Sequence, residues 1–267
     1  MVETIDKIII LGKGFLGTKF AMRGYEVWDK KRFQITMKED YLFPLDGYNV
    51  VVNCIGKSNT RWCEKKRNFA SALWSNGKVP DILSNYCKTM GKKFVHISTG
   101  CLYDDGILPQ SEDNLLAAHC NYTVTKWIGE QGCNERDLIL RPRLLFGDFK
   151  PEGRNNLLCK FPQFTRFLID QNSYTSLDVI VDAFEVLVKN KQSGIFNVAC
   201  DGYASPYEIA QWIGLRGEKI MAKELWESEG LHLVNNMMNL SKLRQFYQPP
   251  KLYDEIMRCW ERLQCGA

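Results

Sequence analysis

The apolar and polar segments of the chain alternate as they do in parallel α/β proteins. Short apolar runs predict strands at residues 7–11, 25–28, 50–54, 94–97 and 138–140. Segments of helical length lie among them and predict helices at residues 15–23, from about residue 60 onward and at 80–90. Strands that alternate with helices pair in parallel through right-handed crossovers.

The pattern loosens after Phe146. It predicts a loop at residues 151–156, helices at 178–189 and 252–263, a strand at 194–199 and a helix that starts at a capping box at 205–208. We therefore expect an α/β fold: a Rossmann-type doubly wound parallel sheet at residues 1–150 and a smaller mixed α/β lobe at 151–267. The lobe is expected to bind substrate, with some of its segments returning to the Rossmann core.

Composition and charge narrow the function classes. Of the 267 residues, 45% are apolar and 25% are charged, which is the balance of a globular protein. The formal charge of +4 is too small and scattered to predict a nucleic-acid partner. The ten cysteines include no CxxC pair and only three histidines occur, so no metal site is predicted.

The amino-terminal residues MVETIDKIII carry acidic side chains and only a short apolar run, unlike a secretory signal. No stretch reaches the roughly 18 apolar residues of a membrane span. We therefore expect no membrane partner, a cytoplasmic location and reduced cysteines.

A glycine motif follows the first predicted strand. Gly12, Gly14 and Gly17, with Phe15 and Leu16 between them, form GxGxxG at the start of a helix. Glycines there allow a tight turn and close approach of a pyrophosphate to the positive helix end. The alternative is a glycine-rich turn without a ligand, but the strand-turn-helix context favours dinucleotide binding.

The residues after the second strand bear on the choice of dinucleotide. Asp29 is placed to accept hydrogen bonds from an adenosine ribose, which favours NAD(H). Lys30 and its neighbours Lys31 and Arg32 could hold a 2′-phosphate, which favours NADP(H), or form a solvated charged turn. The choice stays open, with NADP(H) favoured over NAD(H).

Tyr122 and Lys126 form a YxxxK motif, whose side chains share one face of a helix. An ammonium group beside a phenol stabilises the phenolate and eases proton transfer at neutral pH. The motif also occurs by chance on solvated helices. Here it follows a strand that ends near Thr99, whose hydroxyl could hydrogen-bond a substrate carbonyl.

With these motifs the chain resembles the extended short-chain dehydrogenase/reductase family, although its glycine loop is one residue shorter than that family's usual GxxGxxG. Within the family it is similar to nucleotide-sugar reductases such as dTDP-4-dehydrorhamnose reductase, and especially to UDP-4-keto-6-deoxyglucose 3,5-epimerase/4-reductases of UDP-rhamnose synthesis. The stretches that carry this similarity are residues 59–64, 98–103, 173–178, 194–198 and 235–243.

The resemblance implies roles for individual residues. Thr99, Tyr122 and Lys126 would form the catalytic triad. The residues implied at the cofactor are Asn53, Ile55 and Gly56 after the third strand and Pro142 and Arg143 after the fifth. Asn156 and Asn236 are expected at the substrate, with a helix cap as the alternative for Asn236. Arg154 could pair with the substrate diphosphate or belong to a mobile loop, and Asn76 would support the lysine through water.

Cys101 follows Thr99 by two residues, so in an extended chain both side chains would enter the same cleft. The resemblance implies that Cys101 and Lys160 are the acid and base of epimerisation on opposite faces of the sugar ring. In the alternative reading, Cys101 is a small buried apolar residue and Lys160 a surface charge.

These signals predict an NAD(P)H-dependent 4-reductase that acts on a nucleoside-diphosphate 4-keto-6-deoxyhexose, coupled to 3,5-epimerisation. One alternative is a reductase without epimerase activity, and another is a non-catalytic regulatory subunit that binds dinucleotide. Dimers through a four-helix face are common among relatives, so a homodimer is compatible with the resemblance.

Overall fold

The computed structural model of the chain describes residues 7–29, 32, 45–106, 108–150, 156–229 and 234–265. The chain forms two compact units. Unit 1 comprises Met1–Ser98, Asn121–Leu140 and Ser193–Ile195, and unit 2 comprises Thr99–Cys120, Arg141–Gln192 and Phe196–Ala267. The boundary predicted at residue 150 lies inside unit 2, because the segments after the fourth and fifth strands belong to that unit.

Unit 1 is built on a parallel sheet. Its elements are β1 (Ile8–Leu11), α1 (Phe15–Met22), β2 (Glu26–Trp28), β3 (Val50–Asn53), α2 (Thr60–Cys63), α3 (Phe69–Leu73), α4 (Val79–Thr89), β4 (Lys93–Ile97) and α5 (Asn121–Gln131). Strands β5 (Leu138–Pro142) and β9 (Gly194–Val198) begin in unit 1 and end in unit 2.

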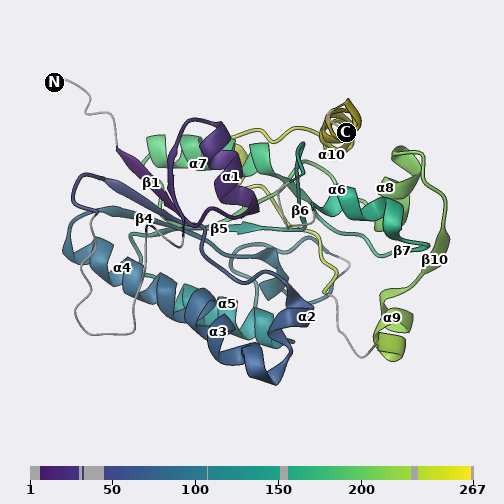
Figure 1. Ribbon diagram of the computed structural model, residues 1–267, viewed down its shortest axis with the longest axis horizontal. Coiled ribbons are helices and arrows are strands. Elements are labelled where there is room, and N and C mark those ends of the chain that lie inside the picture. Colours follow the sequence, from purple (N-terminus) through teal and green to yellow (C-terminus); the bar gives the residue numbers. More distant parts are fainter. Residues whose placement is uncertain are drawn as a thin grey trace. The chain divides into compact units, whose positions relative to one another are not determined.

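The sheet has the order β2-β1-β3-β4-β5-β9, and the pairs from β2 to β5 are all parallel. Helix α1 lies on one face, and helices α3, α4 and α5 lie on the other (Figure 1). This arrangement confirms the predicted Rossmann-type doubly wound fold. Because the strand order reverses between β1 and β3, the switch point, where such sheets bind ligands, lies at the carboxyl end of β1.

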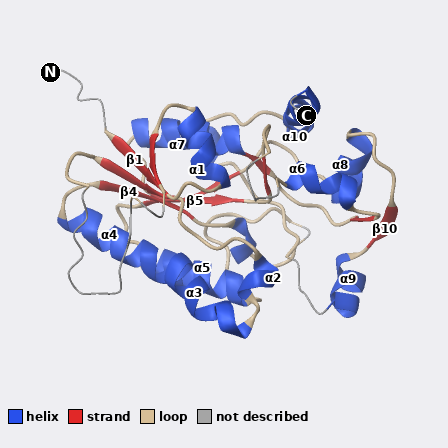
Figure 2. Ribbon diagram, in the orientation of Figure 1, coloured by secondary structure: helices blue, strands red, loops and turns tan. Residues whose placement is uncertain are grey.

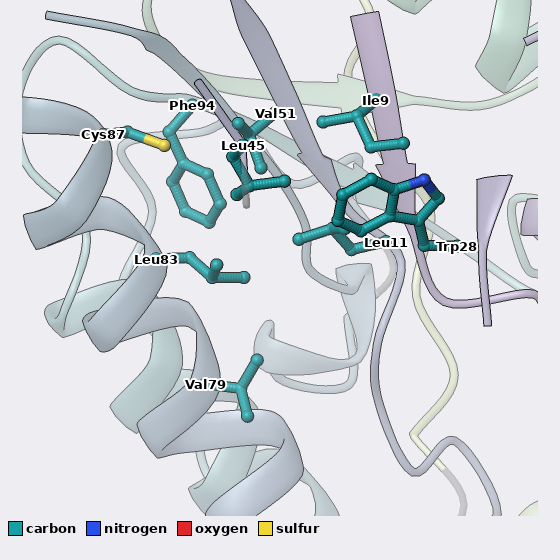
Figure 3. Packing of buried hydrophobic residues seen from close by; sticks show 9 residues of the cluster. All are labelled: Ile9, Leu11, Trp28, Leu45, Val51, Val79, Leu83, Cys87 and Phe94. Atoms are coloured by element: carbon teal, nitrogen blue, oxygen red, sulfur yellow. The ribbon is translucent and has the colours of Figure 1, made fainter. Parts of the chain in front are cut away.

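An apolar layer joins helix α4 to the sheet (Figure 3). Val79, Leu83 and Cys87 repeat at helical spacing on α4, and they face Val51 of β3 and Phe94 of β4. All five side chains are buried. Burial of this layer, at about 25 cal/mol per Å² of apolar surface, stabilises the frame that carries the loops at the strand ends.

Helices α3 and α4 are joined by a π-helical segment, Trp74–Lys78, where the sequence predicted only a continuing helix. Helix α5 packs closely against this segment because glycine occupies both sides of the contact. A Cβ atom on Gly129 would lie 2.1 Å from the carbonyl oxygen of Asn76, and one on Gly77 would lie 3.1 Å from Cγ2 of Ile128.

Unit 2 contains short strands between helices and long loops (Figure 2). Its further elements are β6 (Leu145–Phe146), α6 (Leu157–Lys160), β7 (Arg166–Leu168), β8 (Thr175–Ser176), α7 (Leu177–Lys189), α8 (Pro206–Trp212), β10 (Glu218–Ile220), α9 (Ala222–Glu229) and α10 (Leu252–Cys265). Strands β6 and β8 pair in parallel, as do β7 and β10. The predicted capping box at Ser205 and Glu208 is present at the start of α8.

The substitution Gly129→Ala tests the close contact of α5. The added methyl group would overlap the Asn76 carbonyl group, so we expect the free energy of unfolding to fall by about 1–3 kcal/mol in a denaturant titration. Gly47→Ala is the control, because a Cβ atom there meets nothing within 4 Å and its effect should stay within about 0.5 kcal/mol. Equal stability of the two variants would contradict the packing argument.

Candidate functional site

The glycine turn between β1 and α1 has the geometry that a dinucleotide requires. Gly12 has a φ of +107°, which favours glycine. A Cβ atom on Gly17 would lie 2.0 Å from the Gly12 carbonyl oxygen, so the turn and the helix can approach this closely only without a side chain. Gly14 is the N-cap of α1 and offers no side-chain cap. Backbone N–H groups of the first turn, at Phe15, Leu16 and Gly17, are therefore suited to hold a pyrophosphate.

The side chains after β2 interact with residues close to them in the sequence. The carboxylate of Asp29 accepts a hydrogen bond from the Arg32 backbone N–H at 3.0 Å. The Arg32 guanidinium group lies 4.7 Å from the ring centre of Trp28 and forms a 3.0 Å ion pair with Glu26. Lys30 lies outside the described residues. The described part of this turn therefore does not discriminate between the two dinucleotides.

Asn53 shapes the turn after β3. Its side-chain oxygen accepts the backbone N–H of Ile55 at 3.0 Å, and its amide nitrogen lies 3.2 Å from Nδ1 of His96. Asn53 is fully buried, so it acts on the backbone of the turn. Ile55 is half-buried and Gly56 is exposed, which leaves these two residues as the accessible part of the turn.

Helix α5 carries both members of the YxxxK motif. Tyr122 is 8% exposed and Lys126 is 5% exposed. The Lys126 ammonium group donates a 2.7 Å hydrogen bond to the backbone oxygen of Ile97, the last residue of β4. The ammonium group is thereby fixed at the carboxyl end of the sheet, one helical turn from the phenol.

Asn76 fixes α5 from the π-helical segment. Its side-chain oxygen accepts the Lys57 N–H at 2.7 Å, and its amide nitrogen donates to the Lys57 carbonyl at 3.0 Å and to Thr125 Oγ1 at 3.1 Å. The amide donors are therefore used within the chain. Through Thr125, which immediately precedes Lys126, the Asn76 side chain contacts the helix that carries the lysine.

The backbone after Thr99 differs from the expectation. Thr99 itself is extended, but residues 100–102 form a 3-10 turn, and the Thr99 hydroxyl accepts the Cys101 N–H at 3.2 Å. The extended backbone on which the expected alignment of the Thr99 and Cys101 side chains depended is therefore absent at Cys101. Asn236 holds this turn, because its buried amide donates to the Gly100 carbonyl at 3.1 Å.

Arg143 contacts the same turn within unit 2. Pro142 is the last residue of β5, and Arg143 follows it with 3% exposure. The Arg143 Nη1 atom donates to Cys101 Sγ at 3.0 Å, and its Nη2 atom donates to Asn172 Oδ1 at 2.7 Å. Sequence reasoning placed Arg143 near the nicotinamide and missed Asn172, for which the sequence holds no local signal.

The residues expected at the substrate lie in different settings. Asn156 is fully buried, and its side chain bonds the backbone of Gly147, Phe149 and Leu158. Its polar atoms are thus used to hold a loop, which does not support the expected substrate contact. Lys160 ends α6 and is half-buried. Arg154 lies outside the described residues.

Among the described residues, no group of His, Cys, Asp and Glu side chains is arranged as a metal site. In the same part of the chain, no helix has both the length and the apolar character needed to cross a membrane.

The sequence-family model for the RmlD substrate binding domain matches residues 16–219 of this chain. The chain belongs to this family. Among known proteins, it is 26% identical over 206 residues to a trifunctional UDP-glucose 4,6-dehydratase/UDP-4-keto-6-deoxy-D-glucose 3,5-epimerase/UDP-4-keto-L-rhamnose-reductase of Arabidopsis thaliana. It is 28% identical over 199 residues to a probable low-salt glycan biosynthesis reductase of Haloferax volcanii. The matches cover 71% and 67% of this chain but only 30% and 64% of those proteins.

Solved structures confirm the fold of this RmlD family member. The dTDP-4-dehydrorhamnose reductase of Clostridium acetobutylicum superposes with a TM-score of 0.80 at 19% identity, covering 96% of this chain and 99% of that one. The enzyme of the same name from Bacillus anthracis, in complex with NADP, gives 0.79 at 19% identity, covering 97% and 99%. The UDP-rhamnose synthase of Acanthamoeba polyphaga mimivirus gives 0.80 at 19% identity, covering 97% and 100%.

Buried His96 makes stability depend on pH. Burial, and secondarily the Lys126 charge, hold the pKa of His96 well below its usual value. The unfolded chain therefore takes up a proton below about pH 6.5 that the folded chain does not. As the pH is lowered through this range, the free energy of unfolding decreases by up to about 1.4 kcal/mol per pH unit.

Denaturant titrations from about pH 5 to about pH 7.5 measure this contribution. His96→Asn should remove it, whereas the control His119→Asn, at an exposed position, should leave it in place. An unchanged pH dependence in the His96 variant would refute the assignment.

Proposed function

We propose that the chain is an NADP(H)-dependent reductase of a nucleoside-diphosphate 4-keto-6-deoxyhexose, and that it also epimerises this sugar at C3 and C5. Membership of the RmlD family and the described geometry support the proposal. The observation that carries it is the fixed position of Lys126, whose ammonium group is bound to the end of β4 one helical turn from Tyr122.

The glycine turn fits a dinucleotide, since a side chain at Gly17 would collide with the backbone of the turn and no side chain caps α1. Gly12, Gly14 and Gly17 would hold the pyrophosphate, with Ile55 and Gly56 beside the ring system. We favour NADP(H) because the Bacillus anthracis relative is in complex with NADP, and NAD(H) is the alternative because a related epimerase holds NAD.

In the reductive step the bound nicotinamide supplies the hydride to C4. Tyr122 gives its phenolic proton to the C4 oxygen, and the Lys126 charge stabilises the phenolate that remains. The Thr99 hydroxyl polarises the carbonyl group. Solvent then returns a proton to Tyr122, so the residues end in their starting state.

In the epimerising steps the C4 carbonyl acidifies the protons at C3 and C5. The Cys101 thiolate removes one of these protons, and the electron pair of the broken C–H bond moves into an enolate. The Lys160 ammonium group then gives a proton to the opposite face of the same carbon. Proton exchange with water restores the thiolate and the ammonium group.

All ten cysteines of the chain are free thiols. A mechanism that uses a thiolate requires a reducing environment. We therefore propose a cytosol-like compartment as the site of action.

Tyr122→Phe tests the reductive step. Loss of the proton donor should lower kcat for NADPH oxidation with the 4-keto sugar by about 100-fold or more, with NADPH binding retained. Tyr253→Phe is the control, because that phenol is 50% exposed on α10. If the wild-type protein binds NADPH yet turns over no 4-keto sugar, the non-catalytic subunit is the better account.

Deuterium uptake tests epimerisation apart from reduction. In deuterated water without nicotinamide, the wild-type protein should introduce deuterium at C3 and C5 of the 4-keto sugar, measured by mass spectrometry. Cys101→Ser should slow this exchange by about 100-fold or more, and Cys265→Ser, at an exposed position, should not. If the wild-type protein exchanges no deuterium, the alternative, a reductase without epimerase activity, is the better account.

A further inference from the structure

Arg143 is a buried cation with an unusual set of partners. Its side chain donates to Cys101 Sγ at 3.0 Å, to Asn172 Oδ1 at 2.7 Å and to the Val234 carbonyl group. Its Nε atom is buried without a hydrogen-bond partner. No carboxylate of the described residues forms an ion pair with it.

A buried charge is costly unless an opposite charge or strong hydrogen bonds compensate it. Asn172 and the Val234 carbonyl group are neutral acceptors. Tyr174 interacts electrostatically with Arg143, but burial raises its pKa far above the usual value, so it stays a neutral phenol. Loss of the Cys101 proton would give the guanidinium group an anionic hydrogen-bond partner, which the neutral acceptors are not.

A second arginine–cysteine pair in unit 2 shows the contrast. The Arg258 Nη2 atom lies 3.6 Å from Cys259 Sγ, but Arg258 also forms ion pairs with Asp178 and Glu255 at 2.7 and 2.6 Å. These carboxylates already neutralise the guanidinium charge. Cys259 is fully buried, and burial raises its pKa to about 12, so this thiol stays protonated.

We propose that Arg143 is a positioning residue that holds Cys101 as a thiolate, ready to take the C3 or C5 proton of the sugar. The role rests on the epimerase activity proposed above. Cys101 itself is only half-buried, so its sulfur meets the buried guanidinium on one side and remains accessible to a reagent or substrate.

One hydrogen-bond network fixes both partners. The Arg143 backbone N–H donates to Thr175 Oγ1 at 2.9 Å, and the Asn172 oxygen that accepts Nη2 also accepts the Asn236 N–H at 3.2 Å. Asn236 in turn holds the Gly100 carbonyl group at 3.1 Å. The cation and the turn that bears Cys101 are therefore held by the same two asparagines.

The first test needs no substitution. Iodoacetamide should alkylate Cys101 of the intact wild-type protein at neutral pH about tenfold faster than Cys159, with each site followed by peptide mass spectrometry. Cys159 is the internal reference because it is also half-buried, while burial raises its pKa. Equal alkylation rates at the two sites would overturn the proposal, whatever the variants do.

Variants then assign the effect to the guanidinium group. Arg143→Gln should slow Cys101 alkylation about tenfold, and Arg143→Lys should restore much of the rate because it keeps the charge. Arg166→Gln, at an exposed position of β7, should leave the rate unchanged. Circular dichroism verifies folding, and if Arg143→Gln does not fold, the Arg143→Lys variant decides: a rate as slow as that of Cys159 would contradict the proposal.

Deuterium exchange at C3 and C5 separates this proposal from the proposed activity. If the proposal holds, exchange falls in Arg143→Gln in parallel with alkylation and recovers in Arg143→Lys. If the wild-type protein exchanges deuterium but the rate of Cys101 alkylation does not depend on Arg143, the proposed role of Arg143 is refuted and the epimerase activity stands. If Cys101 is alkylated fast in an Arg143-dependent manner but no deuterium is exchanged, the epimerase activity is refuted and the role of Arg143 in holding the thiolate stands.

Discussion

The close contact between α5 and the π-helical segment positions the proposed proton donor. Gly129 lets the two backbones approach until only hydrogen fits between them, and the Asn76 side chain links Thr125 of α5 to the loop after β3. Because Thr125 immediately precedes Lys126, this contact fixes both the rotation of α5 about its axis and its position along that axis. The Lys126 ammonium group then reaches the end of β4. Packing, rather than the motif alone, converts YxxxK into a candidate site.

Each unit contains a buried cation among its candidate functional residues, Lys126 in unit 1 and Arg143 in unit 2. Lys126 donates to the Ile97 carbonyl group, and Arg143 to the Val234 carbonyl group. Both lie near a thiol, but the two thiols differ. Burial raises the pKa of Cys54, near Lys126, to about 12, against the effect of the lysine charge. Cys101 is only half-buried and accepts a hydrogen bond directly from Arg143.

The sequence predicted those features that depend on neighbouring residues. Strand and helix positions followed from apolar periodicity, and the glycine turn followed from Gly12 and Gly17. The π-helical segment was not predictable, because one extra residue per turn leaves no distinct pattern in the sequence. The 3-10 turn at Cys101 was missed because Asn236, which stabilises it, lies 136 residues from Gly100. The Arg143 contact joins residues 42 positions apart and has no local signal either.

The most direct test of the reductase assignment follows the hydride itself. The protein is incubated with NADPH deuterated at its transferable position and with UDP-, dTDP- and GDP-linked 4-keto-6-deoxyhexoses in turn. The account predicts that one of these sugars gains a single deuterium at C4 for each NADPH consumed, as shown by mass spectrometry and NMR of the product. Binding of NADPH with no deuterium transferred to any of the three would contradict it.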